Sequence, residues 1–428
     1  MTFSCSGICA GFRSPASSGS FNFPAFSLYN KGNSGARGRT RGHRAPLRVI
    51  QKGVSGKVKR ESLRGCKRIV VKVGTSSITY PTGKINLEKM ERLVRELSDL
   101  HNSGRELILV SSGAVGAGAG KLGRTPSSLP EKQALAAVGQ GLLMQMYEKF
   151  FSEYSKSAAQ ILLTRDCFAD PSRYLNFRNT VFALLDYGVV PIVNENDTVA
   201  VDELKFGDND RLSAMVACNA EADLLIILSD IDGLYDADPR RNPDARLIPE
   251  VAAITEAMEA NSTTKGSSMS SGGMATKLAA ARIAMSNGIP MVIASSDERS
   301  AVRRIAGGEP LGTFFVPGRE GYAARRQWLA VGSTPRGILW VDPGAERALL
   351  HQGKSLLPSG IRSVEGDFHP GDVVSIRSES GLEIARGISN YAAGDARRIL
   401  GRHSGEIAAV LGVCDYEEVV HRNNLALV

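Results

Sequence analysis

The sequence predicts an open α/β/α sandwich with a mostly parallel sheet, followed by a small β-rich domain. Apolar runs such as 106–110 and 223–228 are continuous rather than alternating, which is typical of strands buried on both faces of a sheet. Stretches with helical spacing of apolar residues separate these runs, as in folds that alternate strand and helix. After Pro317 the pattern changes to short apolar runs broken by glycines, which indicates a second architecture.

The predicted elements begin near residue 65. A strand ending at Lys72 comes first, because its β-branched residues run directly into Gly74. Asn86 can cap the next helix, in which apolar residues recur at helical spacing: Leu87, Met90, Leu93, Val94, Leu97 and Leu100. The remaining expected elements are strands at 106–110, 158–163, 189–193 and 223–228, and helices at about 130–153, 172–187 and 209–220.

Length and composition set the limits of the prediction. The 428 residues leave room for two or three domains, and 43% hydrophobic residues suffice for sizeable cores. The net charge of +8 does not indicate a nucleic-acid-binding body, because residues 1–60 hold eleven Lys/Arg and no Asp or Glu, which leaves −3 for the rest. Apolar runs fall short of the ~18 residues of a membrane span, so no membrane partner is expected. The six cysteines form no CxxC pair or regular framework, which indicates reduced thiols.

Residues 1–60 have the composition of an organelle transit peptide, rich in Ser, Gly and Arg and free of acidic residues. The Ser-rich, weakly charged beginning favours a chloroplast (plastid) location over a mitochondrial one. The alternatives are a mitochondrial transit peptide, an ordinary disordered tail of a cytoplasmic protein, and a basic RNA-binding arm. In each case residues 1–60 stand outside the predicted folded domains.

Asp and Asn are concentrated in two short segments, 193–197 and 207–210. The first follows the apolar run 189–193, so these residues suit a loop at the end of a strand, where ligands bind in α/β sheets. On their own they could be ordinary turn residues.

Two lysines beside Gly/Ser-rich turns favour a functional site. Lys72 stands in a predicted buried strand, where lysine is a poor choice unless its ammonium group acts at the strand end. Lys277 closes a small-residue loop that begins at Ser271 and leads into a helix. Such a loop can present backbone N–H groups to phosphate oxygens, with lysine as a point charge. Each lysine alone could be a solvated side chain, but together with the Asp/Asn segments they indicate a phosphoryl-transfer site.

Other catalytic patterns are excluded. The glycines at 118–123 match the GxGxxG motif of dinucleotide-binding folds, but they lie too far beyond the preceding strand. The segment is not a P-loop either, because Leu122 occupies the position where that motif requires Ser or Thr. Residues 102–350 contain no histidine, so neither a Ser-His-Asp hydrolase nor a histidine-rich metal centre can be built from that stretch. Phosphorylation of a carboxylate has no such requirement, because a carboxyl group with a pKa of about 4.3 is already ionised at neutral pH.

The chain resembles the amino-acid kinase family, and within it the branch that phosphorylates the side-chain carboxylate of free glutamate. The matching segments follow the family's order between about 65 and 317: VVKVGTS, LVSSGAVGAG, ALAAVGQ, PIVNENDTV, FGDNDRLSA, LLIILSDIDGLYDADPR and SGGMATKL. The resemblance implies ATP-dependent formation of glutamyl 5-phosphate, the first step of proline biosynthesis, with Mg²⁺ bound together with ATP. It also implies a homo-oligomer and feedback inhibition by proline.

The same resemblance implies roles for individual residues. Lys72 and Lys277 match the catalytic lysines, and Asp210 matches the aspartate that orients them. Ser112, Asp197 and Asn209 match the glutamate-binding positions. The positions that match nucleotide-binding residues are Lys72, Ser229, Asp230, Ser271, Gly272, Gly273, Met274, Ala275, Thr276 and Lys277. No protein residue is assigned as a metal ligand.

Residues 336–428 resemble a PUA domain, a small pseudo-barrel, joined by a charged linker at 318–335 to the kinase domain at 65–317. PUA domains bind RNA in other proteins, but this segment lacks a basic and aromatic surface run, so RNA is not expected as a partner. The alternatives are an RNA-associated PUA protein with an inactive kinase-like domain, or a kinase for aspartate or acetylglutamate. Intact Lys72, Asp210 and Lys277 favour an active kinase.

Overall fold

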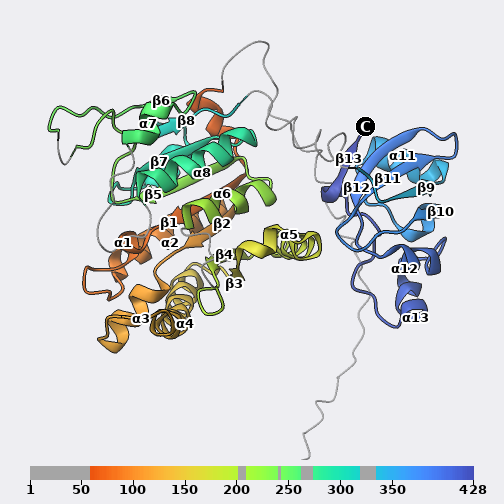
Figure 1. Cartoon of the computed structure of the whole chain (residues 1–428), viewed down its shortest axis with the longest axis horizontal. Helices are drawn as coiled ribbons and strands as arrows, with labels where there is room; N and C mark the ends of the chain where they lie inside the picture. The colour runs from red at the N-terminus through yellow and green to blue at the C-terminus, as the bar shows by residue number, and fades with distance from the viewer. Residues whose placement is uncertain (1–57, 201–208, 240–241, 262–272, 319–333) are drawn as a thin grey trace, which may run out of the picture. The chain divides into compact units, whose positions relative to one another are not determined.

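The computed structural model of the chain describes residues 58–200, 209–239, 242–261, 273–318 and 334–428 (Figure 1). The predicted leader therefore lies outside the described residues except for its last three. One of these, Arg60, belongs to the folded body. Its guanidinium donates hydrogen bonds of 2.6–2.7 Å to the backbone oxygens of Pro249, Leu311 and Gly312.

The first domain contains the open, mostly parallel sheet that the sequence predicts (Figure 1). Its eight described strands follow the order β3-β4-β2-β1-β5-β7-β8-β6. All neighbours from β3 to β7 pair in parallel, and β8 pairs with β7 in antiparallel orientation. The strands are β1 (Arg68–Val73), β2 (Glu106–Ser111), β3 (Ala158–Leu163), β4 (Val190–Glu195), β5 (Leu224–Ser229), β6 (Glu250–Val251), β7 (Met291–Ser295) and β8 (Thr313–Phe315).

Helices cover both faces of this sheet. Successive side chains of a strand point to opposite faces, so Val71 joins one hydrophobic cluster, with α2, α4 and α9, while Val70 joins the other, with α5, α6 and α8. This arrangement confirms the predicted α/β/α sandwich. The helices are α1 (Thr75–Ile78), α2 (Leu87–Asn102), α3 (Ala114–Leu122), α4 (Leu129–Glu153), α5 (Pro171–Asp186), α6 (Asn209–Asn219), α7 (Glu256–Asn261), α8 (Met274–Ser286) and α9 (Ala301–Ala306), with 3-10 turns η1 (Arg60–Gly65) and η2 (Arg165–Phe168).

The helix α2 forms almost as its sequence predicts. The Asn86 side chain accepts a hydrogen bond of 3.1 Å from the backbone N–H of Lys89, which confirms the predicted cap. The apolar stripe is buried from Met90 onward, but Leu87 is 54% exposed. Leu87, the first residue of α2, is therefore not part of the buried stripe.

The glycines around residue 118 allow two helices to pack closely. A Cβ atom at Gly118 would lie 2.0 Å from the Leu135 backbone oxygen, and one at Gly139 would lie 1.8 Å from that of Ala114. Only glycine permits this approach of α3 to α4. The glycine-rich segment therefore has a packing role between helices, rather than serving a phosphate loop.

The second domain has a five-stranded sheet with the order β10-β9-β11-β12-β13. A separate hydrophobic cluster, which includes Leu339, Ile376 and Phe368, forms the core of this domain. The predicted β-rich architecture is thus confirmed. Its elements are β9 (Gly337–Val341), α11 (Pro343–Gln352), η4 (Pro358–Gly360), β10 (Ile361–Gly366), β11 (Val373–Ser378), β12 (Glu383–Ile388), α12 (Ala393–Arg398), η5 (Ser404–Glu406), α13 (Ile407–Leu411), η6 (Arg422–Asn424) and β13 (Leu425–Leu427). Across both domains, no described helix combines the length and apolar character that a membrane span requires.

The close packing of α3 on α4 generates a prediction about stability. Gly139→Ala should lower the free energy of unfolding by about 1–3 kcal/mol, because the new methyl group forces the helices apart. Gly141→Ala is the matched control on the same helix, since a Cβ atom there meets nothing within 4 Å. It should raise stability by about 0.5–1 kcal/mol. Urea unfolding measures both changes, and a neutral Gly139→Ala variant would contradict the close approach.

Candidate active site

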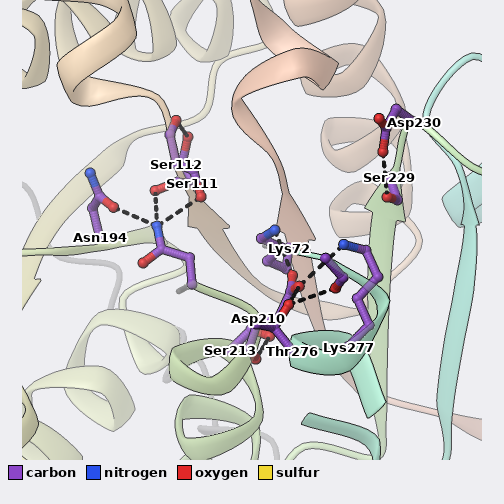
Figure 2. A network of polar contacts seen from close by, with 12 residues as sticks. Lys72, Ser111, Ser112, Asn194, Asp210, Ser213, Ser229, Asp230, Thr276 and Lys277 are labelled. Carbon is purple, nitrogen blue, oxygen red and sulfur yellow. Dashed lines mark hydrogen bonds and ion pairs between the residues drawn. The ribbon is translucent and has the colours of Figure 1, made fainter. Parts of the chain in front are cut away.

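The site lies at the carboxyl ends of neighbouring parallel strands, as expected for an α/β sheet (Figure 2). The strands β4, β2, β1 and β5 are adjacent, and Val73 at the end of β1 pairs with Ser111 on β2 and Leu228 on β5. Polar side chains emerge where these strands end. Two helices that cover the same face of the sheet, α6 and α8, bring further side chains to this edge.

One buried carboxylate holds two lysines together (Figure 2). Lys72 Nζ on β1 lies 2.5 Å from Asp210 Oδ1, and Lys277 Nζ on α8 lies 3.3 Å from Asp210 Oδ2. Asp210 is fully buried, and both lysines are 5% exposed. The three residues that the sequence predicts as catalytic thus form a single cluster with a net charge of +1.

The electrostatics of this cluster keep Asp210 ionised. Burial alone would raise the pKa of its carboxyl group, but attraction to Lys72 and Lys277 outweighs burial and lowers the pKa to about 2. Asp210 also lies in the first turn of α6, where the helix dipole favours a negative charge. The carboxylate therefore remains charged at every physiological pH.

Thr276 adds a third contact to the Asp210 carboxylate. Its hydroxyl lies 3.0 Å from Asp210 Oδ2 and 2.7 Å from the backbone oxygen of Gly273. Gly273 occupies the N-cap of α8, and Met274 and Ala275 begin the helix. The start of α8 is therefore fixed against α6 beside the two lysines. The sequence assigned Thr276 only to the nucleotide, and its contact with Asp210 was missed.

Asn209, the residue before Asp210, organises a second polar cluster. Its Nδ2 atom lies 3.1 Å from the Ser111 backbone oxygen, 2.9 Å from Ser112 Oγ and 2.7 Å from Asn194 Oδ1. This arrangement unites Ser112 and Asn209, both predicted as substrate-binding, at the ends of β2 and α6. Because Asn209 and Asp210 are consecutive, the first turn of α6 connects this cluster to the lysines.

Two residues of the long helix α4 support the second cluster. Gln140 Oε1 accepts a hydrogen bond of 2.8 Å from Asn194 Nδ2, and the fully buried Tyr147 hydroxyl lies 2.8 Å from Ser111 Oγ. Burial raises the pKa of Tyr147, so the hydroxyl stays protonated. Neither residue was assigned to the site from the sequence. A tyrosine on the apolar face of a helix cannot be told apart from an ordinary core residue in the sequence.

The first Asp/Asn segment differs from its prediction. Asn194 and Glu195 were expected in a loop, but β4 continues through Glu195 and buries both side chains. On the neighbouring strand β3, Leu162 pairs with Asn194 and Leu163 pairs with Glu195. These pairs extend β4 through Glu195. Asp197 follows in a turn and is half-buried. Residues 207 and 208 lie outside the described residues.

The predicted nucleotide-binding residues are placed only in part. Ser229 ends β5, next to β1, and its hydroxyl donates a hydrogen bond of 3.0 Å to Asp230 Oδ1. Ser271 and Gly272 lie outside the described residues. Within the described ranges, no group of three or more His, Cys, Asp or Glu residues is placed to hold a metal ion.

Family models match both domains of the chain. The model of the amino acid kinase family matches residues 67–295, and the PUA domain model matches residues 337–411. The glutamate 5-kinase of Carboxydothermus hydrogenoformans is 56% identical over 86% of this chain and 100% of its own length. That of Moorella thermoacetica is 55% identical over 86% of this chain and 97% of its own. The chain therefore belongs to the amino acid kinase family.

The contact between Thr276 and Asp210 generates a prediction about turnover. Thr276→Val should lower kcat about 10- to 100-fold, since a hydrogen bond to a charged group contributes roughly 1.5–3 kcal/mol. Thr276→Ser keeps the hydroxyl and should recover most of the rate. Steady-state kinetics with matched melting curves measures the effect. Equal rates for the Val and Ser variants would show that the hydroxyl does not position Asp210.

Proposed function

We propose that this chain transfers the γ-phosphoryl group of ATP to the side-chain carboxylate of free L-glutamate, forming glutamyl 5-phosphate for proline biosynthesis. The observation that carries the proposal is the Asp210 carboxylate holding Lys72 and Lys277 beside the Asn209 cluster. The glutamate 5-kinases that match over nearly their whole length support the choice of substrate. The intact lysine–aspartate cluster disfavours an inactive kinase-like domain.

The chemistry needs positioning more than proton transfer. A glutamate side chain with a pKa of about 4.3 is ionised at neutral pH and can attack phosphorus without a general base. The obstacle is the repulsion between this carboxylate and the anionic phosphates. The ammonium groups of Lys72 and Lys277 offset that repulsion and stabilise charge on the phosphoryl group during transfer.

Asp210 serves this reaction through the lysines. Two ammonium groups repel each other, and a shared carboxylate allows both to stay charged within one buried site. Because all three side chains are buried and bonded, the positive charges are already in place before ATP binds. Such preorganisation avoids the cost of reorienting groups during the reaction.

Magnesium bound together with ATP would supply further neutralisation of the phosphate charge. Both Asp210 oxygens face lysine ammonium groups, so this carboxylate is unsuited to be a metal ligand. An ion bound with ATP would be held mainly by phosphate oxygens and water, as is common for Mg²⁺. By family resemblance we further infer a homo-oligomer that proline inhibits, without RNA as a partner.

The first test of this function removes one lysine charge. Lys277→Met should leave the fold intact and lower kcat by about 10³ or more, the scale known for charge-stabilising groups at phosphoryl transfer. Lys354→Met, at an exposed lysine of the second domain, is the control and should retain the wild-type rate. A coupled assay of glutamate-dependent ADP formation measures both. Wild-type turnover in folded Lys277→Met would exclude the assignment.

A second test concerns the acid that is phosphorylated. The α-ammonium group of free glutamate requires a carboxylate partner, and Asp197, half-buried after β4, is our candidate. Asp197→Asn should raise KM for glutamate about 10- to 100-fold, with little change for ATP. Acetylglutamate, whose nitrogen is uncharged, should be a poor substrate for the wild-type chain. An unchanged glutamate KM, or equal use of acetylglutamate, would contradict the substrate assignment.

We also propose a plastid location, supported by the acid-free, Ser- and Arg-rich composition of the leader. A fluorescent reporter carrying residues 1–57 should enter plastids, and the chain without them should keep its activity. The deletion stops before Arg60 because that side chain bonds to the folded domain. Mitochondrial or cytosolic fluorescence would overturn the proposed location.

A further inference from the structure

The second domain contains a cavity of about 360 Å³ that the kinase chemistry does not use. It lies against the face of the five-stranded sheet opposite the domain's hydrophobic core. Leu339 and Ile376 point into that core, while their strand neighbours Ile338, Ser375 and Arg377 line the cavity. We call this cavity the C-terminal pocket; its charged lining residues are Arg336, Glu365, Arg377, Glu383 and Arg386.

One pair of these charges is already neutralised within the protein. Arg386 contacts Glu383 in bidentate fashion, with Nε 2.8 Å from Oε1 and Nη2 3.1 Å from Oε2. The Ser375 hydroxyl adds a hydrogen bond of 2.8 Å to Glu383 Oε1. The hydrogen bonds from Arg386 lower the pKa of the Glu383 carboxyl group despite its partial burial. This hydrogen-bonded pair forms one part of the pocket lining and carries no net charge.

Arg377 and Arg336 leave positive charge available. Arg377 is half-buried, and its Nε lies 3.4 Å from Ser375 Oγ, a long contact with a neutral group. Arg336 is exposed at the rim. Within the described part of the chain, no carboxylate lies within ion-pair distance of either arginine. Arg377 is nevertheless the register partner of Glu383 on β12, and its charge helps to lower the pKa of that carboxyl group. The Glu365 carboxylate, in turn, accepts a hydrogen bond of 2.8 Å from the indole N–H of Trp340.

We propose that the C-terminal pocket binds a small molecule through an oxyanion group, a carboxylate or a phosphate, held by Arg377 and Arg336. A guanidinium group presents parallel N–H donors that match two oxygens of such an anion. The volume is at the small end of ligand pockets and leaves room for a small metabolite. The proposal is independent of the kinase activity, because the pocket shares no residue with the active site.

Trp340 provides a direct readout of binding. The chain has two tryptophans, and Trp328→Phe leaves Trp340, whose indole contacts the lining residue Glu365, as the single emitter. Inorganic phosphate and succinate, titrated separately into the full chain at constant ionic strength, test the two anion types. At least one should change Trp340 emission saturably, with Kd of roughly millimolar or tighter. The probe that changes Trp340 emission identifies the type of anion, and a change with both probes shows that the pocket accepts either type.

The emission response of three variants tests where the anion binds. Arg377→Gln should weaken the response at least about 10-fold, as expected for loss of a charge-assisted hydrogen bond. Arg362→Gln, at an exposed arginine of the same domain outside the lining, should leave it unchanged. Lys277→Met should also retain the response, which separates the pocket from the active site. Matched melting curves confirm folding.

Three outcomes would overturn the proposal. The first is no saturable change with either probe. The second is an unaltered response in Arg377→Gln, or a response that Lys277→Met abolishes. The third is a response to a short RNA oligonucleotide but to neither small anion, which would assign the surface to nucleic acid.

Discussion

The active site depends on the burial of two ammonium groups around one carboxylate. Taking Asp210, Lys72 and Lys277 out of water is costly, and their mutual attraction offsets this cost only when all three are in contact. Removing one member of such a buried group typically costs 3–5 kcal/mol. The strand β1, the start of α6 and the start of α8 must therefore keep fixed relative positions. The packing of α6 and α8 on one face of the sheet meets this requirement.

Two neighbouring residues in the first turn of α6 contact different parts of the site. Asp210 faces the lysines, while Asn209 faces Ser112 and Asn194 on the adjacent strands. The groups assigned to phosphate charge and those assigned to glutamate thus share one rigid backbone segment. A shift of α6 would therefore disturb both clusters together. The Asn209 cluster has further support from α4, through Gln140 and Tyr147.

The sequence predicted the mostly parallel sheet with strands β1 to β5, and the unusual positions of Lys72 and Lys277, because continuous apolar runs and lysines beside Gly/Ser-rich turns are local signals. The role of Asp210 came from family resemblance. It did not predict that β4 runs through Glu195, since Asn and Glu rarely occupy buried strands unless tertiary hydrogen bonds satisfy them. Gln140 ends the matching segment ALAAVGQ but received no role, and Tyr147 gave no signal, because the partners of both polar atoms come from distant parts of the chain. The roles of Asn209 and Asp197 came from family resemblance rather than from spacing, and the structure places only Asn209 in a defined cluster.

The most direct measurement of the central claim is acyl phosphate formation by Asp210→Asn, which keeps the shape of the side chain but removes its charge. Hydroxylamine converts an acyl phosphate into a hydroxamate, so hydroxamate formed from glutamate and ATP reports the product itself. We expect the variant to fold and to form hydroxamate at least about 100-fold more slowly than the wild-type chain, the scale for loss of one electrostatic group at a preorganised site. A folded Asp210→Asn protein with the wild-type rate would show that the shared carboxylate is not what prepares the two lysines for phosphoryl transfer.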